Sequence, residues 1–172
     1  MNYFEALKYG TLLLKSNNIK TFNLDSELIL SEALNLTREQ ILINQKKRIK
    51  KEDFNVYKNL LDRRKNNEPI AYITKKKEFW RYSFIVSKDV LIPRPETEQI
   101  VEEVLKYIGL SASKHVLDIG TGSGCIIISI LKERPEFHGT AVDISKKALK
   151  VAISNAKMHH LRNKIKFINI DI

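Results

Sequence analysis

The first third of the chain repeats apolar residues with the period of an α-helix. Four of them recur at near-helical spacing before the helix-breaking pair Asn17-Asn18: Phe4, Leu7, Leu12 and Leu14. Three further helices are expected before residue 67. Together they predict a small helical bundle over residues 1–67. Its sequence has no glycine or histidine cluster of the kind that a catalytic site needs.

Capping signals mark two of these helices. Asp25 is suited to cap the second helix, because its carboxylate can accept hydrogen bonds from the free N–H groups of the first turn. Thr37 followed by Gln40 has the spacing of a capping box, which predicts a short third helix. A fourth helix is expected from about 52 to 65, with four residues facing inward: Phe54, Tyr57, Leu60 and Leu61.

The pattern changes after residue 67. The stretch IAYITKKKEFWRYSFIVS is rich in β-branched and aromatic residues around a polar centre, which predicts a β-hairpin. It leads into IPRPETE, where two prolines exclude a helix interior or a central strand. We therefore expect residues 68–95 to form a hairpin linker and a stiff loop, which holds Arg94 and Glu96 in fixed directions.

Strands and helices alternate in the remainder of the chain. Such alternation predicts an α/β fold with a parallel sheet and crossover helices. A helix from about 96 to 108 comes first. The elements expected after it are, in order, a strand at 115–119, a helix at 125–133, a strand at 139–143, a helix at 145–160 and a strand at 165–170.

The segment VLDIGTGSGCIIISI carries the main candidate site. A buried strand ends here in a glycine-rich loop, beyond the carboxyl end of the strand, where open α/β sheets bind ligands. The next strand ends in Asp143, whose carboxylate can accept hydrogen bonds from both hydroxyls of a ribose. A nucleotide cofactor is expected at this loop, which consists of Gly120, Thr121, Gly122, Ser123 and Gly124.

Two features separate the possible cofactors. Nicotinamide dinucleotides are bound by G-x-G-x-x-G, whereas this loop has G-x-G-x-G. Asp118 would face a pyrophosphate badly but suits the cationic end of S-adenosylmethionine. Both features favour S-adenosylmethionine. Asp171 ends the third strand and is a candidate acceptor for the adenine amino group, although a plain strand-ending aspartate explains it equally well.

Composition and charge narrow the class of protein. The net charge is +10, which favours acidic partners such as RNA, although a genome-wide habit of Lys-, Asn- and Ile-rich usage explains it more simply. One cysteine, Cys125, allows no internal disulfide. The N-terminus lacks the features of a signal peptide, and no apolar run approaches the roughly 18 residues of a membrane span. We expect a soluble cytoplasmic protein, without a membrane partner or a metal site.

The segments EPIAYIT, KEFW, LIPRPETE, VLDIGTGSGCI and AVDIS follow one another along most of the chain. Together they resemble the N5-glutamine methyltransferases of bacterial peptide chain release factors. LIPRPETE, between a helical region and a GTGSG core, is the most specific of them. A related branch of the family methylates a glutamine of a ribosomal protein and usually lacks the exact PRPETE sequence, so the release-factor branch is favoured.

The resemblance implies an organisation in three parts. Residues 1–67 would be a helical domain that docks on a folded release factor. Residues 68–95 would form the hairpin linker, and residues 96–172 the first half of a Rossmann-like class I methyltransferase domain. The activity implied is methyl transfer from S-adenosylmethionine to the side-chain amide nitrogen of a glutamine, so nucleic acid is not the expected substrate.

The resemblance also implies roles for single residues. The loop from Gly120 to Gly124 would cradle the methionine part of the cofactor, and Asp143 would hold the ribose. Asp171 and the backbone of Ile172 would contact the adenine. Three residues of the proline-rich loop would border the methyl-transfer site: Arg94, Glu96 and Thr97.

Two departures from the family pattern affect these expectations. Lys75 stands where the family commonly has glycine, so the hairpin can differ there. The family's catalytic motif, Asn-Pro-Pro-Tyr, follows the fourth strand, whereas this sequence ends at Ile172, after the third. We therefore expect no catalytic residue in this chain and no activity from it alone. The strand at 115–119 would have an open edge, a site of association.

Two other functions remain open at this point. An N6-adenine methyltransferase acting on RNA or DNA shares the core and the type of missing motif, and the basic charge favours it slightly. A non-catalytic module that only binds cofactor or partner would need no further motif.

Overall fold

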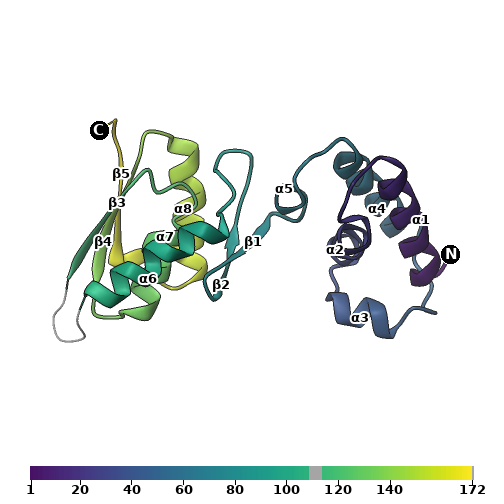
Figure 1. Cartoon of the computed structure of the whole chain (residues 1–172), viewed down its shortest axis with the longest axis horizontal. Coiled ribbons are helices and arrows are strands. Elements are labelled where there is room, and N and C mark those ends of the chain that lie inside the picture. Colours follow the sequence, from purple (N-terminus) through teal and green to yellow (C-terminus); the bar gives the residue numbers. More distant parts are fainter. Residues whose placement is uncertain (109–113, 172) are drawn as a thin grey trace. The chain divides into compact units, whose positions relative to one another are not determined.

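The computed structural model describes residues 1–108 and 114–171. The chain divides between Thr74 and Lys75 into two compact units, which we call the helical unit (Met1–Thr74) and the sheet unit (Lys75–Ile172) (Figure 1). Each unit has its own hydrophobic core, and among the described residues the two cores have no member in common.

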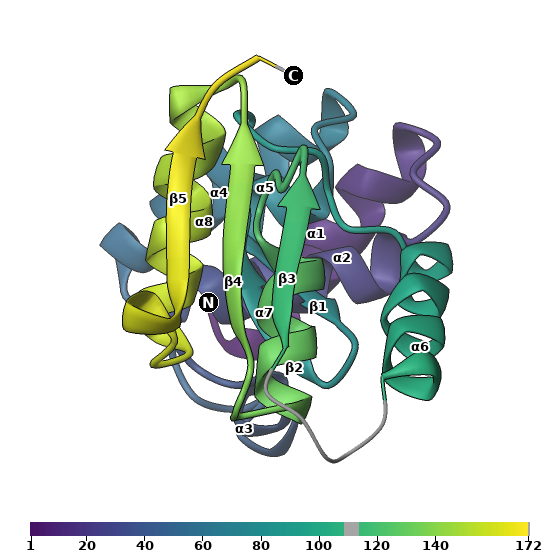
Figure 2. The ribbon, with the colours of Figure 1, turned by 90° about the vertical axis from the view of Figure 1, so that its left-hand side faces the viewer.

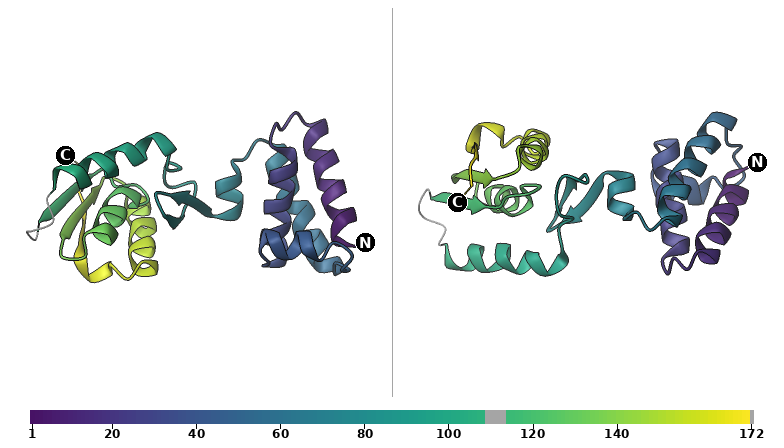
Figure 3. Two further views of the ribbon diagram at one scale, coloured as in Figure 1. Left: turned by 60° about the horizontal axis from the view of Figure 1, so that its bottom comes forward. Right: turned by 90° about the horizontal axis from the view of Figure 1, so that it is seen from above.

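The helical unit confirms the predicted bundle. Its three long helices, α1, α2 and α4, pack side by side (Figure 3). The capping box predicted at Thr37 and Gln40 is present at the start of α3, with both hydrogen bonds formed. The helices of this unit are α1 (Tyr3–Ser16), α2 (Phe22–Leu34), α3 (Arg38–Ile43), α4 (Lys51–Lys65) and α5 (Ile70–Thr74).

The buried face of helix α1 consists of Tyr3, Ala6, Gly10 and Leu14, so it includes a glycine and leaves some large apolar residues outside. Gly10 is buried, whereas Phe4 is 54% exposed and Leu12 is 57% exposed. A Cβ atom at Gly10 would lie 2.0 Å from the hydroxyl oxygen of Tyr57 on α4. The same hydroxyl shares a 2.6 Å hydrogen bond with Ser26 on α2. Only a residue without a side chain allows the three helices to approach this closely.

The prediction that Asp25 caps the second helix is wrong. Helix α2 begins at Phe22, with Thr21 in the N-cap position. Asp25 lies inside the first turn and is 2% exposed. Its carboxylate accepts a hydrogen bond from the Thr21 hydroxyl at 2.7 Å and one from Nε of Arg64 at 2.6 Å. The aspartate is therefore the buried half of an ion pair that joins α2 to α4.

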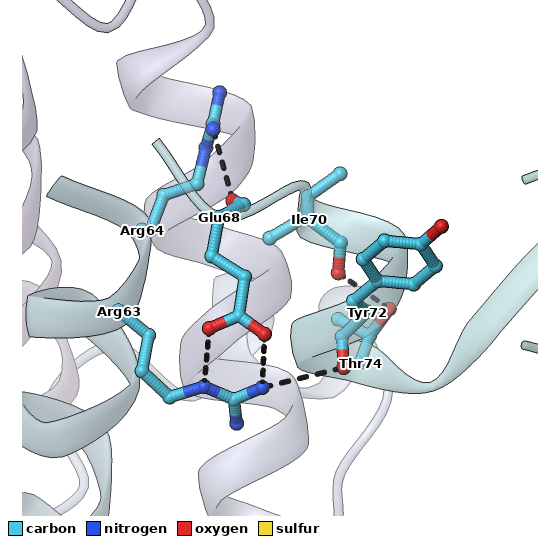
Figure 4. Close-up of polar contacts among 6 residues, drawn as sticks. All are labelled: Arg63, Arg64, Glu68, Ile70, Tyr72 and Thr74. Atoms are coloured by element: carbon cyan, nitrogen blue, oxygen red, sulfur yellow. Dashed lines mark hydrogen bonds and ion pairs between the residues drawn. The ribbon is translucent and has the colours of Figure 1, made fainter. Parts of the chain in front are cut away.

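Two arginines at the end of α4 hold the turn that leads into α5 (Figure 4). Arg63 donates two hydrogen bonds to the carboxylate of Glu68, at 2.8 Å and 2.7 Å, and a longer one to the carbonyl of Tyr72. Arg64 donates to the main-chain carbonyl of Glu68 at 3.0 Å. Because this turn is fixed, the stretch at 70–74 continues as helix α5, and the expected hairpin begins only afterwards.

The sheet unit confirms the predicted alternation of strands and helices. Within the described residues of both units, no helix is long and apolar enough to cross a membrane. The elements of the sheet unit are β1 (Lys76–Phe79), β2 (Tyr82–Ile85), a 3-10 turn (Pro95–Thr97), α6 (Glu98–Tyr107), β3 (His115–Ile119), α7 (Cys125–Glu133), β4 (His138–Asp143), α8 (Lys146–Met158), a second 3-10 turn (Arg162–Lys164) and β5 (Ile165–Asn169).

The hairpin of β1 and β2 is antiparallel, and the residue just before it has an unusual backbone. Lys75, where the family resemblance implies a glycine, has a φ of +55°, in the left-handed region. Its carbonyl accepts the N–H of Val86 at 3.1 Å, which closes the open end of the hairpin. The lysine therefore keeps the backbone geometry that glycine adopts without strain.

The main sheet has the order β3-β4-β5, with all strands parallel. Figure 2 shows these strands in front of α7 and α8, which cover one face of the sheet. On the other face Leu117 is 58% exposed and Ile119 is 59% exposed. Among the described residues β3 pairs with β4 alone, so its second edge is open. Association through this edge stays a prediction.

Candidate functional site

The glycine-rich loop joins the carboxyl end of β3 to the start of α7. All three of its glycines have positive φ angles, +72° at Gly120, +54° at Gly122 and +79° at Gly124. Residues with a side chain adopt this conformation only at a cost, so glycine at these positions lets the chain reverse within five residues. Thr121 accepts the N–H of Gly124 at 2.8 Å, which closes the turn.

The first and the last glycine of the loop have different surroundings. A Cβ atom at Gly120 would meet nothing within 4 Å, so the backbone here borders open space that a ligand can enter. A Cβ atom at Gly124 would lie 3.1 Å from Ile128 and 3.3 Å from Ala152 of α8. Gly120 thus suits ligand approach, whereas Gly124 lets helix α8 pack against the loop.

Asp143 ends β4 beside this loop and holds it. One carboxylate oxygen accepts the N–H of Gly122 at 2.9 Å, and the other accepts the N–H of Ser145 at 2.8 Å. A carboxylate oxygen has two acceptor positions, so each oxygen keeps one for a ligand hydroxyl. The side chain is half-buried. This geometry leaves room for the ribose contacts that the sequence suggests.

A second carboxylate, Asp118, lies at the same end of the sheet. It accepts a hydrogen bond from the hydroxyl of Thr121 at 2.8 Å. Burial raises the pKa of Asp118, the hydrogen bond from Thr121 lowers it, and the negative charge of Asp143 raises it further. Two neighbouring carboxylates, one of them poorly solvated, make this a site that favours a cation.

The third strand contributes a residue that the sequence reasoning missed. The side-chain amide of Asn169 donates hydrogen bonds to the carbonyls of Asp143 at 2.9 Å and Ile144 at 2.8 Å. It therefore fixes the end of β4 from the neighbouring strand. The pairing of Asn169 with Asp143 exists only in the folded sheet, so the sequence carried no signal for this role. Asp171, the predicted adenine contact, is exposed beyond β5, and Ile172 lies outside the described residues.

The proline-rich loop forms the short 3-10 turn before α6. Arg94 and Glu96 are exposed, Thr97 is half-buried, and Thr97 donates its N–H to the carbonyl of Arg94 at 3.0 Å. Within the described part of the chain, no hydrogen bond or ion pair joins these three residues to the glycine-rich loop. The carboxylate of Glu98, next in sequence, accepts the N–H of Trp80 at 2.9 Å and so attaches this loop to the hairpin.

Cys125 opens helix α7 next to the loop, but it is no nucleophile. The thiol is buried, and burial raises its pKa to about 11. It is therefore protonated at neutral pH and fills space beneath the loop.

The sheet unit has the fold of a class I methyltransferase. Its sheet is parallel with crossover helices, a glycine-rich loop follows the first strand of this sheet, and an aspartate ends the second. Models of two families match the chain, the PrmC N-terminal domain over residues 5–74 and a methyltransferase domain over residues 110–172. The chain belongs to the release factor glutamine methyltransferase family.

Three curated relatives, each called release factor glutamine methyltransferase, show the extent of the similarity. The relative from Leptospira interrogans is 42% identical over 87% of this chain and 53% of its own length. The relative from Buchnera aphidicola subsp. Baizongia pistaciae is 39% identical over 91% of this chain and 56% of its own length. The relative from Clostridium acetobutylicum is 37% identical over 100% of this chain and 60% of its own length. The chain thus spans little more than half the length of these relatives.

Proposed function

We propose that the whole protein transfers a methyl group from S-adenosylmethionine to the side-chain amide nitrogen of a glutamine in a peptide chain release factor. The observation that carries this proposal is the glycine-rich loop held by Asp143 at the carboxyl ends of parallel strands, in a chain of this family. The reaction is assigned to the cytoplasm, with a protein and not a nucleic acid as substrate.

The residues at the carboxyl ends of the strands suit the methyl donor. The open backbone at Gly120 gives the methionine part a surface to lie on. Asp143 has free acceptor positions for the two ribose hydroxyls, and Asp171 is proposed to accept from the adenine amino group. The poorly solvated carboxylate of Asp118 is stabilised by a nearby cation, such as the ammonium group of the methionine part.

The bound donor supplies an electrophilic methyl group on a sulfonium. An amide nitrogen is a poor nucleophile, because its lone pair is delocalised into the carbonyl group. The protein therefore has to hold that nitrogen in line with the methyl group at near-attack distance. We assign Arg94, Glu96 and Thr97 to the border of the reaction site, where their exposed loop is stiffened by two prolines.

The helical unit is proposed to dock on the release factor. Its described residues form a closed bundle with a core of its own, and no part of it resembles a catalytic site. Rigid helices suit recognition of a folded protein surface, because little conformational entropy is lost on binding.

A direct test uses the complete gene product, purified release factor and S-adenosylmethionine labelled in its methyl group. Label on a single glutamine, mapped by mass spectrometry, is the expected result. A parallel reaction contains RNA and DNA oligonucleotides in place of the release factor. Label on adenine instead of glutamine, or no binding of S-adenosylmethionine in calorimetry, would refute the proposal.

A further inference from the structure

Helix α8 carries an amide side chain in the core of the sheet unit. Asn155 is fully buried, with an exposed fraction of 0%. It lies one turn after Ala152, the residue that packs against Gly124, so the same face of α8 approaches the glycine-rich loop. A buried amide is costly unless its donors and its acceptor all find partners.

Asn155 satisfies its hydrogen-bonding groups with two separate segments of backbone. Its amide nitrogen donates to the carbonyl of Ser123 in the glycine-rich loop at 2.8 Å. The same nitrogen donates to the carbonyl of Ile85 at 2.9 Å, and its oxygen accepts the N–H of Ile85 at 2.7 Å. One side chain therefore binds both the loop after β3 and the end of strand β2.

The contact with Ile85 resembles the pairing between two strands. Strand β2 pairs with β1 along one edge, and Asn155 provides a donor and an acceptor to the peptide groups of its last residue. The chain beyond Ile85 is anchored in the core by Val86 and Val90, which are 0% and 5% exposed, and then reaches Arg94. The hairpin is also joined directly to the end of the proline-rich loop, because the N–H of Trp80 donates to the carboxylate of Glu98 at 2.9 Å.

The contact with Ser123 fixes the direction of one peptide group in the glycine-rich loop. Ser123 is 2% exposed, and its carbonyl is turned toward α8 by the amide of Asn155. The following residue, Gly124, has a left-handed backbone and closes the turn onto Thr121. Loss of the donor at Asn155 would leave the Ser123 carbonyl buried and unpaired, so the loop would have to move to regain a partner.

We propose that Asn155 is a positioning residue that couples the glycine-rich loop to the hairpin and, through it, to the loop at Arg94–Thr97. This inference rests on the proposed function for its ligand, S-adenosylmethionine. Binding of the donor against the glycine-rich loop then holds Ile85 more firmly, and loosening of Ile85 weakens binding of the donor. The role differs from that of a core residue, which would affect folding without affecting the loop selectively.

The control for this proposal lies on the same helix. Nε2 of His159 donates a hydrogen bond to the carbonyl of Ser83 at 2.9 Å, and the centre of its ring lies 5.0 Å from that of Phe84. It thus also attaches the hairpin to the end of α8, but none of its hydrogen bonds or ring contacts in the described structure involves the glycine-rich loop. Asn155→Ala and His159→Ala both weaken the attachment of the hairpin, and only the first frees Ser123.

The experiment measures the dissociation constant of S-adenosylmethionine by calorimetry, together with thermal melting, for the complete gene product and for both variants of it. We expect Asn155→Ala to raise the dissociation constant about tenfold or more, the effect of one lost buried hydrogen bond. His159→Ala should lower the melting temperature and change the dissociation constant less than about twofold. Equal dissociation constants for the two variants would overturn the coupling role.

Hydrogen exchange of the unaltered complete gene product gives an answer even if Asn155→Ala does not fold. The N–H of Ile85 should exchange more slowly when S-adenosylhomocysteine is bound, whereas that of Phe137, in the turn after α7, should not change. Unchanged exchange at Ile85 under saturation overturns the inference alone. No binding of either ligand by the unaltered complete gene product overturns the proposed donor site and the inference with it.

Discussion

The main-chain N–H of Gly122 donates a 2.9 Å hydrogen bond to the carboxylate of Asp143, so the residue proposed to hold the ribose also holds the loop beneath the cofactor. The second oxygen of the same carboxylate fixes the start of the connection to α8 through Ser145. We therefore expect Asp143 to act on ligand binding in two ways, through its free acceptor positions and through the shape of the loop.

Asp143→Ala should weaken binding of S-adenosylmethionine by roughly tenfold or more, because charge-assisted hydrogen bonds are lost. Calorimetry on the variant measures this loss. Glu103→Ala is the control, since Glu103 is an exposed residue of α6 that pairs only with Lys106 among the described residues. Unchanged affinity in the Asp143 variant would reject the ribose role.

Gly124→Ala should destabilise the sheet unit by about 2 kcal/mol, through the left-handed backbone and the crowding against α8. Gly120→Ala has a similar φ angle and no crowding, so about 1 kcal/mol is expected. Denaturant unfolding ranks the two variants. The order should reverse for binding of S-adenosylmethionine, where the open backbone at Gly120 is the surface for the ligand.

Lys75→Gly should stabilise the protein by about 1 kcal/mol. The left-handed φ of +55° strains lysine and not glycine. Relief of this strain should exceed the extra entropy that the more flexible glycine chain loses on folding. Lys76→Gly is the matched control, because Lys76 is an exposed strand residue where glycine only weakens β1. A fall in unfolding free energy for both variants would show that the backbone at residue 75 is unstrained.

Arg64→Ala should destabilise the helical unit by about 3 kcal/mol. The substitution leaves the carboxylate of Asp25, whose side chain is 3% exposed, buried without its charged partner. Arg63→Ala removes an equally short ion pair to Glu68, but the arginine is 38% exposed, so a cost of about 1 kcal/mol is expected. If the two variants lowered the melting temperature by the same amount, burial of the ion pair would not explain its contribution to stability.

The stability of the sheet unit should decrease in mild acid because of His159. Burial lowers the pKa of this imidazole below its ordinary value of 6.5, and the charges of Lys132 and His160 lower it further. The unfolded chain therefore binds the proton more readily, so stability is complete above pH 6.5 and falls as the pH drops through the folded-state pKa. His159→Gln should reduce this slope of melting temperature against pH between about 7.5 and 5.5.

Sequence periodicity predicted the strands and helices of the sheet unit, because each buried strand or amphipathic helix there carries its own local pattern. It predicted only part of the buried face of α1, because Leu14 is buried and Leu7 packs against the core, whereas Phe4 and Leu12 are exposed. Phe4 and Leu12 have the larger apolar side chains, but the Tyr57–Ser26 contact leaves space only for Gly10. Asp25 looked like a helix cap because its partner, Arg64, lies far along the chain.

The candidate site shows the same division between local and distant signals. The glycine-rich loop and Asp143 were found from their spacing alone, since a short motif places them. Asn155 and Asn169 were missed because their importance comes from contacts with backbone of other strands and loops, which leave no motif. The sequence analysis assigned Ile70 to Thr74 to the hairpin. The helix there follows a turn at Glu68 that is held by arginine side chains of α4, and no local pattern shows these contacts.

The two separate hydrophobic cores give the chain a modular character. Substitutions in one core should alter the free energy of unfolding independently of substitutions in the other, because the two cores share no described residue. Over evolutionary time the helices that we propose to dock on the partner can therefore change while the proposed cofactor-binding unit stays intact. Recombination that joins such a bundle to a different sheet domain would also leave both hydrophobic cores undamaged.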